Sequence, residues 1–522
     1  MSNLVMNARL ARQSTRAFDR ILIVTGDDLE AKFWEAILNE KHAVDGPKYW
    51  VERGKKGNLL GALQAYAAAR DTYPNGTAID QILMLFGSGT RLSPFTQSLR
   101  NVKAAFPLPD GNRDSKGITT GEAAIRSTTP LINCLQEAGF SGVVVSWGDE
   151  VLIPSRPLAG NSGTISKADV VRFGWRKDPD KDLATQKEWL QVDMTTGAVV
   201  RDISRQPFDQ LAHVLQSTSG SQMATFVNLG SLAATHEFLS VACDAFGKRI
   251  VDESSVANWD PYFWQALQCP SRRSWDELVR YEQRAGLAGL QALLDNIPDF
   301  FEIVHHFRME FERRVGRPLR VSVLDFGQPY WIDVGNHAAL SNAFSDLFSA
   351  SQSGTAIRAF LGLPDSLATG ASFIADSSLP EHCKVDNSIV IGTTITDEES
   401  TICGAIVLGS NIGRVVADRG ASVVWCRVED LRVDGPSGIG FRLDGHKHVV
   451  RGDESATTLL LSERVVDLRY AHRLGNIDRR IFETRLLDNP VSFSEAASLV
   501  RSVDPVELHR SWTAKLAMRS GI

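Results

Sequence analysis

Continuous apolar runs alternate with helical patterns through the first part of the chain. RILIVTGDD, QILMLF and GVVVSWGDE, at 20–28, 81–86 and 142–150, predict strands buried on both faces. LEAKFWEAILNEK (29–41) and TTPLINCLQEAG (128–139) have the spacing of amphipathic helices. Strands of consecutive Val, Ile and Leu separated by helices indicate a parallel sheet covered on both faces. We therefore expect an α/β fold with a Rossmann-like, mostly parallel sheet.

Other patterns follow this core. KEWLQVDMTTGAVVRDISRQP (187–207) alternates as a β-hairpin does, and ATFVNLGSLAATHEFL (224–239) predicts a strand, a turn and a helix. The chain from 260 to about 314 is mainly helical. Beyond Ala375, short Ile and Val pairs recur every five to seven residues. That rhythm is typical of β-helix coils, each burying its apolar corner under the next, although its irregularity also fits a plain antiparallel β-domain.

Length and composition bound the class of protein. A chain of 522 residues exceeds one ordinary core, so we divide it into residues 1–360, an α/β domain, residues 361–462, a left-handed β-helix-like domain, and residues 463–522, a helical C-terminal segment suited to packing or homo-oligomer formation. With 43% hydrophobic and 23% charged residues, the composition is that of a globular protein. A net charge of −6 argues against nucleic acid as a partner, because phosphate backbones need a basic face.

The cysteines and the N-terminus bear on location. Six cysteines are scattered without a Cys-x-x-Cys pair, which favours reduced thiols in the cytoplasm over a disulfide framework or a zinc site. MSNLVMNARLARQSTRAFD has no apolar core of signal-peptide length, and no later run approaches ~18 apolar residues. We expect a cytoplasmic protein with no membrane span.

The first candidate for chemistry is a glycine loop with two cations. QILMLF ends in Gly87-Ser88-Gly89-Thr90-Arg91, and Lys103 follows. A glycine turn commonly ends a strand, so the glycines alone are weak evidence of function. The two cations strengthen the case, because glycines let a phosphate approach backbone amides while positive side chains hold its charge.

Two aspartates end predicted strands. Asp149 follows GVVVSW and Asp333 follows YWI, and each alone is more often a turn residue or a helix cap. Ligands of open α/β sheets bind at the carboxyl ends of the strands. Carboxylates there, beside a cationic glycine loop, suit Mg²⁺, which takes a few carboxylates together with substrate phosphates.

These motifs carry a resemblance. GSGTRLSPFT, Lys103, WGDE, FVNLG and WIDVGNHAALSNAF occur in the order seen in sugar-phosphate nucleotidylyltransferases, whose catalytic domain the chain from Arg20 to about Phe348 resembles. A strand and GKKGNLLGAL precede the loop, an order similar to the fucose 1-phosphate guanylyltransferase group. The resemblance implies a nucleotide-sugar-forming enzyme that joins a nucleoside triphosphate, with GTP preferred, to a sugar or cyclitol 1-phosphate, releases pyrophosphate and needs Mg²⁺.

The resemblance also implies roles for particular residues. Arg91 and Lys103 would be catalytic, and Asp149 and Asp333 would hold Mg²⁺. The remaining roles would be triphosphate binding by Gly87, Ser88, Gly89 and Thr90, base contact by Gly57, Asn58 and Gly61, and a border of the sugar pocket at Asn228 and Gly230. A tight helix start explains the first glycines of the base site almost as well.

The chain departs from the family pattern at several points. Phe86 stands where the usual loop has a first glycine, which puts the nucleotide base in doubt. Lys103 follows Arg91 at a longer spacing than usual, so Arg100 is a substitute if the lysine is displaced. The glutamate-lysine pair that often contacts the sugar is absent from ISRQP, which leaves Arg205. Two alternatives stay open: a β-helix acyltransferase acting on a nucleotide sugar, and a non-catalytic scaffold or regulatory paralogue.

Overall fold

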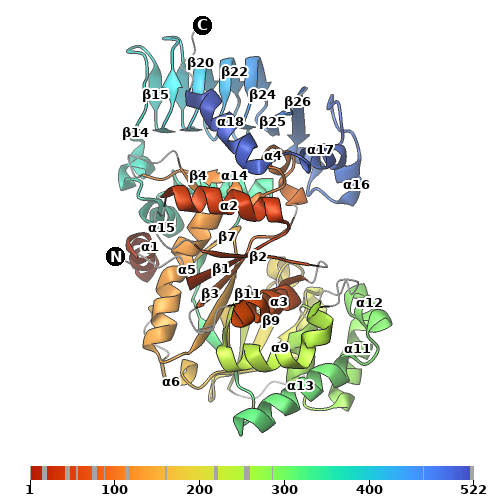
Figure 1. Cartoon of the computed structure of the whole chain (residues 1–522). Coiled ribbons are helices and arrows are strands. Elements are labelled where there is room, and N and C mark those ends of the chain that lie inside the picture. Colours follow the sequence, from red (N-terminus) through yellow and green to blue (C-terminus); the bar gives the residue numbers. More distant parts are fainter. Residues whose placement is uncertain are drawn as a thin grey trace.

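The computed structural model shows a mixed α/β protein with two parallel-stranded regions (Figure 1). A nine-stranded sheet has the order β2-β1-β3-β6-β11-β8-β12-β10-β9. None of the helices among the described residues is long and apolar enough to cross a membrane. The structure describes residues 2–14, 20–41, 47–53, 57–72, 79–87, 89–111, 117–158, 162–216, 222–251, 259–260, 262–284, 286–461 and 464–517.

The N-terminal half of the large sheet is parallel, as the apolar runs predict. It consists of β1 (Ile21–Thr25), β2 (Lys48–Val51), β3 (Gln81–Met84) and β6 (Gly142–Trp147). Successive residues of β1 face opposite sides: Ile21 and Ile23 pack with α2 (Asp28–Lys41) and α5 (Thr120–Glu137), whereas Leu22 and Val24 pack with α3 (Gly57–Thr72) and α9 (His236–Val251). Burial on both faces explains why these strands are apolar throughout.

The other half of the sheet is mixed, so the prediction of a mostly parallel sheet is wrong for this half. The long strand β11 (Met223–Thr235) runs antiparallel to β6 and to β8 (Val170–Arg176). The predicted hairpin is confirmed as β9 (Trp189–Asp193) and β10 (Ala198–Ile203). β9 also pairs antiparallel with β11. β12 (Val321–Asp325) pairs parallel with β8.

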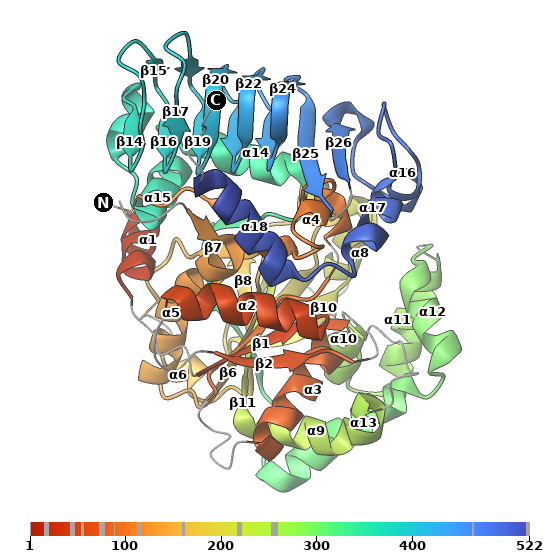
Figure 2. The same ribbon diagram turned by 45° about the horizontal axis from the view of Figure 1, so that its top comes forward.

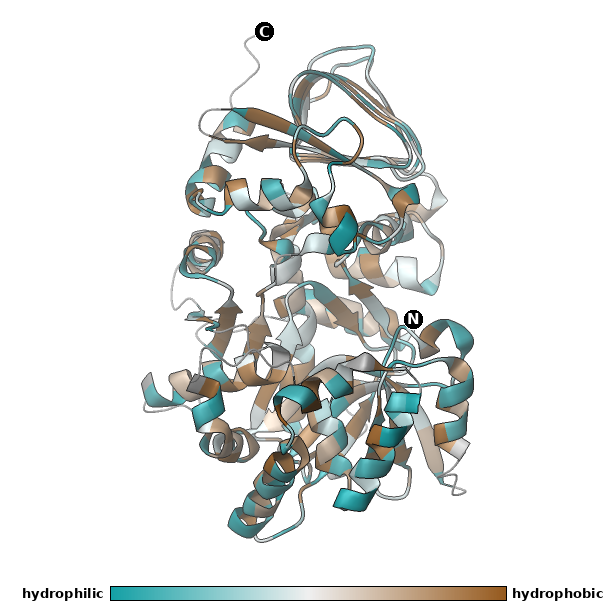
Figure 3. Ribbon diagram, turned by 90° about the vertical axis from the view of Figure 1, so that its right-hand side faces the viewer, coloured by the Kyte–Doolittle hydropathy of each residue, from teal (hydrophilic) through white to brown (hydrophobic). Residues whose placement is uncertain are grey.

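The expected helical region lies at one end of this sheet (Figure 2). It contains α10 (Tyr262–Gln268), α11 (Arg272–Arg284), α12 (Ala288–Asn296) and α13 (Phe300–Val315). Buried aromatic rings join α9, α10 and α13. Phe307 of α13 packs edge to face on Phe238 and tilted on Phe246, both of α9, and Phe246 packs edge to face on Phe263 of α10. The apolar positions concentrate on the strands and the inner faces of the helices (Figure 3).

The C-terminal region contains two parallel sheets between which the chain alternates. One has the order β14-β16-β19-β21-β23-β25-β26 and the other the order β15-β18-β20-β22-β24, with β17 beside β20. Apart from β25–β26, every pairing is parallel, so the plain antiparallel domain is wrong. Successive turns of the chain nearly superimpose in Figure 3. The strands are β14 (Phe373–Ala375), β15 (Lys384–Asp386), β16 (Ile389–Ile391), β17 (Thr394–Ile395), β18 (Thr401–Cys403), β19 (Ile406–Leu408), β20 (Asn411–Ala417), β21 (Ser422–Val424), β22 (Arg427–Val433), β23 (Ile439–Phe441), β24 (Asp444–Val450), β25 (Glu454–Leu460) and β26 (Val465–Ala471).

The C-terminal sheets pack directly on the N-terminal region. Ile389 and Ile391 of β16 belong to the apolar cluster that includes Ile23, whereas Val390 points between the two C-terminal sheets. The last segment was expected to be helical, but it begins with β26, which extends the sheet. The helices α16 (Arg479–Glu483), α17 (Phe493–Val500) and α18 (Pro505–Ala517) follow. α18 lies against α2 (Figure 2).

Candidate functional site

The candidate site lies at the carboxyl ends of β3 and β6. Gly87 follows β3 with φ +118°, and Gly89 has φ +56°, so both occupy the left-handed region that glycine tolerates. A Cβ on Gly89 would lie 2.6 Å from Cβ of Lys103, so the loop packs closely on that lysine. Ser88 lies outside the described residues. Thr90 and Arg91 form the short 3₁₀ turn Thr90–Leu92, and Arg91 is exposed.

Lys103 lies beside the glycine loop despite its longer spacing from Arg91. The intervening residues form α4 (Phe95–Ser98), and Lys103 begins a second 3₁₀ turn, Lys103–Ala105. Its Nζ lies 2.8 Å from Oδ2 of Asp149, whose side chain is 8% exposed. A Cβ on Gly87 would lie 3.8 Å from the same Nζ. The glycine loop, the lysine and the first predicted aspartate therefore meet.

Arg100 does not substitute for Lys103. Its guanidinium is buried and donates to both carboxylate oxygens of Asp27, at 2.9 and 3.0 Å, and to the carbonyls of Arg501 and Val503. Arg100 thus connects the loop after β1 to the C-terminal segment.

Asp333 is brought next to Asp149 by a two-stranded sheet. β7 (Glu150–Ile153) pairs antiparallel with β13 (Tyr330–Asp333), with Asp333 opposite Glu150, and the amide of Val334 donates to the carbonyl of Asp149 at 2.9 Å. Gly335 donates to Oδ1 of Asp333 at 2.9 Å. A Cβ on Gly335 would lie 2.6 Å from Oδ1 of Asp333 and 2.9 Å from Nη2 of Arg91, so both side chains approach the backbone of this glycine.

The donors fit a small, hard cation. In the described ranges, no group of three or more His, Cys, Asp or Glu side chains is arranged to hold a metal ion. Two carboxylates at neighbouring strand ends suit Mg²⁺ bound jointly with phosphate oxygens and water, since this ion rarely uses an all-protein cage. Oδ1 of Asp333 holds the turn through Gly335, which leaves Oδ2 as its candidate metal ligand.

A polar cavity of about 480 Å³ opens beside these groups. The predicted Asn228 and Gly230 line it: Asn228 donates to Oε2 of Glu188 at 3.0 Å and accepts from the amide of Gly230 at 3.2 Å. A Cβ on Gly230 would lie 2.9 Å from Nε1 of Trp147, so the glycine lets that indole line the cavity. The lining residues are Trp147, Glu150, Arg172, Lys187, Glu188, Ser204, Arg205, Asn228, Leu229, Gly230, Asp260, Tyr262, Leu287, Gly289, Trp331 and Asp333.

Sequence reasoning missed Lys187 and Glu188. Lys187 Nζ lies 3.5 Å from the centre of the Trp331 ring, and burial lowers the pKa of this ammonium. Glu188 lies 3.8 Å from Arg205. A lysine and a glutamate are therefore present at the cavity, but directly before β9 and not in ISRQP, which follows at the end of β10. The available signal was the charged pair directly before an apolar strand.

Arg172 is a second residue that the sequence did not reveal. It is 2% exposed, lies 4.6 Å over the Trp264 ring, and its Nη1 is 3.3 Å from Oδ1 of Asp202. Neither Nε nor Nη1 has a hydrogen bond of good geometry. Burial raises the pKa of Asp202 to about 6, against the opposing charge of Arg172. A buried guanidinium with spare donors marks the cavity wall as suited to a polar ligand.

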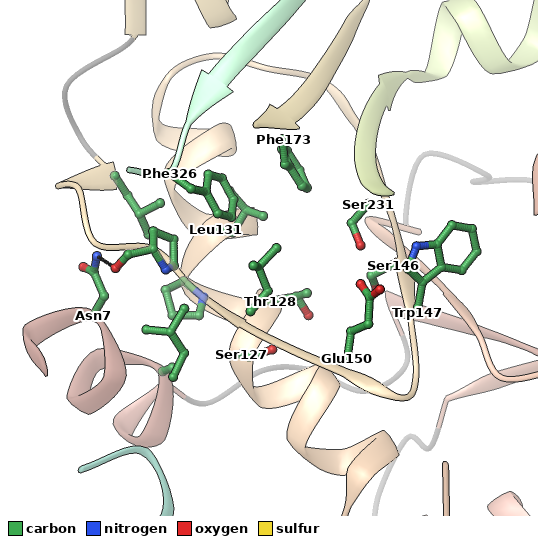
Figure 4. A pocket seen from close by; sticks show the side chains of 16 residues that line it. Asn7, Ser127, Thr128, Leu131, Ser146, Trp147, Glu150, Phe173, Ser231 and Phe326 are labelled. Atoms are coloured by element: carbon green, nitrogen blue, oxygen red, sulfur yellow. Dashed lines mark hydrogen bonds between the residues drawn. The ribbon is translucent and has the colours of Figure 1, made fainter. Parts of the chain in front are cut away.

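Glu150 stands between the large cavity and a smaller one. The smaller cavity, about 20 Å³ and mainly apolar, lies between α1 (Asn3–Gln13), α5 and β7 (Figure 4). Burial, followed by the neighbouring charges of Asp149 and Asp333, raises the pKa of Glu150 well above its ordinary value. Oε2 of Glu150 has no hydrogen-bond partner.

Of the predicted base contacts, Gly57 and Gly61 are not among the described residues that line the cavity. Gly57 starts α3 with φ +73°, and its amide donates to Oε1 of Glu52 at 2.9 Å. A Cβ on Gly61 would lie 3.2 Å from the same oxygen and 3.5 Å from Cε of Met84 at the end of β3. The side chain of Asn58 lies outside the described residues. The tight start of α3 thus accounts for the conformation of Gly57, and the base site stays a prediction.

Comparison with known proteins adds no relative: no protein-family model matches the chain, and no curated protein matches it.

Proposed function

We propose that this protein is a Mg²⁺-dependent nucleotidylyltransferase that joins a nucleoside triphosphate to a sugar or cyclitol 1-phosphate and releases pyrophosphate. The observation that carries the proposal is the ion pair of Lys103 and Asp149 under the glycine loop, with Arg91 and Asp333 against Gly335. Nucleotidyl transfer from a triphosphate to a sugar phosphate needs cations and metal-binding carboxylates at one place. The order of the motifs supports the same reaction by resemblance.

The proposed chemistry needs no covalent nucleophile. A phosphate oxygen of the sugar 1-phosphate attacks the α-phosphorus in line, the new P–O bond forms, and the bond to the β-phosphate oxygen breaks. Both reactants are anions, so Lys103 and Arg91 would reduce their repulsion and fix their orientation. Asp149 and Asp333 would hold Mg²⁺, which when bound neutralises charge on the phosphates.

The cavity supports a polyhydroxylated second substrate. Its wall combines carboxylates that accept from hydroxyls with Arg172, Lys187 and Asn228, which donate to them, and indoles that suit the apolar face of a ring. Lys187 is the cation we assign to the phosphate of this substrate, because it lies in the same cavity as Asp333. GTP is the preferred nucleotide through the resemblance alone.

The finer fold assignment belongs to the same proposal. We take residues 1–360 as the nucleotidyltransferase domain and the two parallel C-terminal sheets as faces of a left-handed β-helix. The nearly superimposed turns and parallel pairing support a β-helix.

The test is pyrophosphate release by the purified full chain with Mg²⁺, each nucleoside triphosphate in turn, and a panel of sugar and cyclitol 1-phosphates. At least one pair should react, and Lys103→Met should abolish the reaction while Lys447→Met does not. Lys447 is an exposed lysine of β24 that is paired with Asp430 of β22, far along the chain from the site. No release with any pair, together with no nucleotide binding by calorimetry, would favour the scaffold. Acyl transfer to a nucleotide sugar would favour the acyltransferase.

A further inference from the structure

A chain of hydrogen bonds through His337, Ser455 and the half-buried His472 connects the candidate site to the C-terminal sheet. Ser455 of β25 lies between two imidazoles, with Oγ 2.8 Å from Nδ1 of His337 and 2.8 Å from Nε2 of His472. The other nitrogen of His337, Nε2, lies 2.6 Å from the carbonyl oxygen of Ser93. Ser455 and Ser93 are completely buried and His337 is 5% exposed.

The partners fix the direction of every hydrogen bond. The carbonyl of Ser93 only accepts, so Nε2 of His337 carries a proton and donates to it. Nδ1 of neutral His337 therefore accepts from the Ser455 hydroxyl, whose oxygen accepts in turn from Nε2–H of His472. Burial lowers the pKa of His337 to about 3, so this ring is neutral, as its acceptance from Ser455 requires; burial also lowers the pKa of His472.

Both site segments end on this chain of bonds. Ser93 closes the turn that bears Thr90 and Arg91, because its amide and its hydroxyl donate to the carbonyl of Thr90 at 3.1 and 2.7 Å. His337 begins α14 (His337–Asp346), directly after the Asp333–Gly335 turn. One imidazole thus ties the arginine-bearing turn to the aspartate-bearing turn.

We propose that His337 is a positioning residue that holds the turn bearing Arg91 beside the turn bearing Asp333, and that Ser455 and His472 set its orientation from the C-terminal sheet. The role given to Arg91 rests on the proposed function. The C-terminal sheet therefore helps to position the candidate site, in addition to packing on the N-terminal region. Ser455, completely buried, is not available as a nucleophile for an external substrate.

The surroundings leave His337 little freedom. Its ring lies 5.1 Å from the rings of both Phe95 and Tyr470 and 5.3 Å from that of His472. Phe95 in turn packs on Phe441 of β23, with ring centres 5.3 Å apart. Because these rings surround His337, a change at Ser455 should move His337 and, through its hydrogen bond, Ser93. Contacts made in the transition state are sensitive to such small shifts of position.

The first test compares Ser455→Ala with Thr457→Val. Thr457 lies two residues further along β25 and is equally buried, and its hydroxyl has no hydrogen-bond partner among the described residues, so removing this hydroxyl is the matched control. Ser455→Ala should lower kcat about tenfold to 100-fold with the KM of each substrate unchanged, as expected when a transition-state group is misplaced. Thr457→Val should leave kcat unchanged. Equal kcat in both variants would overturn the proposal.

The second test does not depend on turnover. In Ser455→Ala and His337→Phe, hydrogen exchange should quicken at the amides of Leu92 and Ser93, which donate within the turn, but not in Thr457→Val. His337→Gln, whose amide can still donate to Ser93, should restore part of the protection. Unchanged exchange in His337→Phe would overturn the proposal even if Ser455→Ala failed to fold. If the wild-type protein shows no turnover but the variants show these exchange changes, only the proposed function is rejected.

Discussion

Lys103 Nζ lies 2.8 Å from Oδ2 of Asp149, and this ion pair joins two elements that the sequence keeps apart. Lys103 comes from a 3₁₀ turn and Asp149 from the end of β6. The aspartate side chain is almost completely buried, so the lysine also compensates its charge. The pair therefore joins two distant segments of the chain, and in the proposed reaction Lys103 would also supply a cation for phosphate.

Replacing Lys103 should separate these two roles. Lys103→Met should abolish pyrophosphate release and destabilise the fold by about 1–3 kcal/mol, because it leaves Asp149 buried without its partner. The double variant Lys103→Met/Asp149→Asn should recover much of that stability without recovering activity. Urea denaturation and a coupled pyrophosphate assay measure both quantities. A double variant no more stable than Lys103→Met would contradict the compensation.

Asp333 and Asp325 form a matched pair for testing the metal assignment. Each ends a strand and accepts from the amide of a glycine two residues on, at 2.9 Å. Asp333→Asn should abolish turnover and leave the thermal midpoint nearly unchanged, because the amide oxygen still accepts that bond. Asp325→Asn should retain activity. EDTA should stop the wild-type reaction and Mg²⁺ should restore it. Wild-type rates from Asp333→Asn would mean that Asp333 does not hold the metal.

Lys187 should act on the second substrate. Lys187→Met should raise the KM for the sugar or cyclitol phosphate at least about tenfold, since a charge-assisted contact is worth more than ~1.4 kcal/mol, and leave the KM for the nucleotide unchanged. Lys177 is the control: it too lies over an indole, 4.7 Å from the Trp175 ring, and is paired with Asp180. An equal rise in the nucleotide KM would place Lys187 on the triphosphate instead.

Glu30 should make stability depend on pH. Its side chain is buried, Oε2 accepts from the amide of Gly26 at 2.7 Å, Oε1 has no partner, and burial raises its pKa to about 8. The folded state therefore holds the proton more tightly than the unfolded state, whose carboxyl titrates near 4.5. Stability should fall as the pH rises from about 4.5 to 8.

The Glu30→Gln variant tests this directly. It should be more stable than wild type by about 2–4 kcal/mol near pH 8, with no difference near pH 4. Glu35→Gln, at an exposed position of the same helix, should show no such trend. A constant difference across this pH range would mean that Glu30 is ionised in the folded protein throughout.

Local patterns were reliable where burial decides the residue types. β1, β3, β6 and the hairpin β9–β10 lie where the apolar runs and the alternation predicted them. The mixed part of the large sheet was not predictable, because a single strand does not reveal the direction of its neighbour. β26 was missed although it alternates as a strand does, with Val466, Leu468 and Tyr470 buried between polar residues; its antiparallel pairing with β25 became visible only in the structure.

The sequence by itself determined that a glycine loop would follow one apolar strand, with two cations after it, and that two aspartates would follow other strands, because these residue types and turns are local properties of the chain. Only the tertiary structure decided which charges meet. It placed Lys103 on Asp149, assigned Arg100 to Asp27, and brought Lys187 into the cavity. Such contacts depend on how distant segments pack and pair, and the pairing of β7 with β13 is what sets Asp333 beside Asp149.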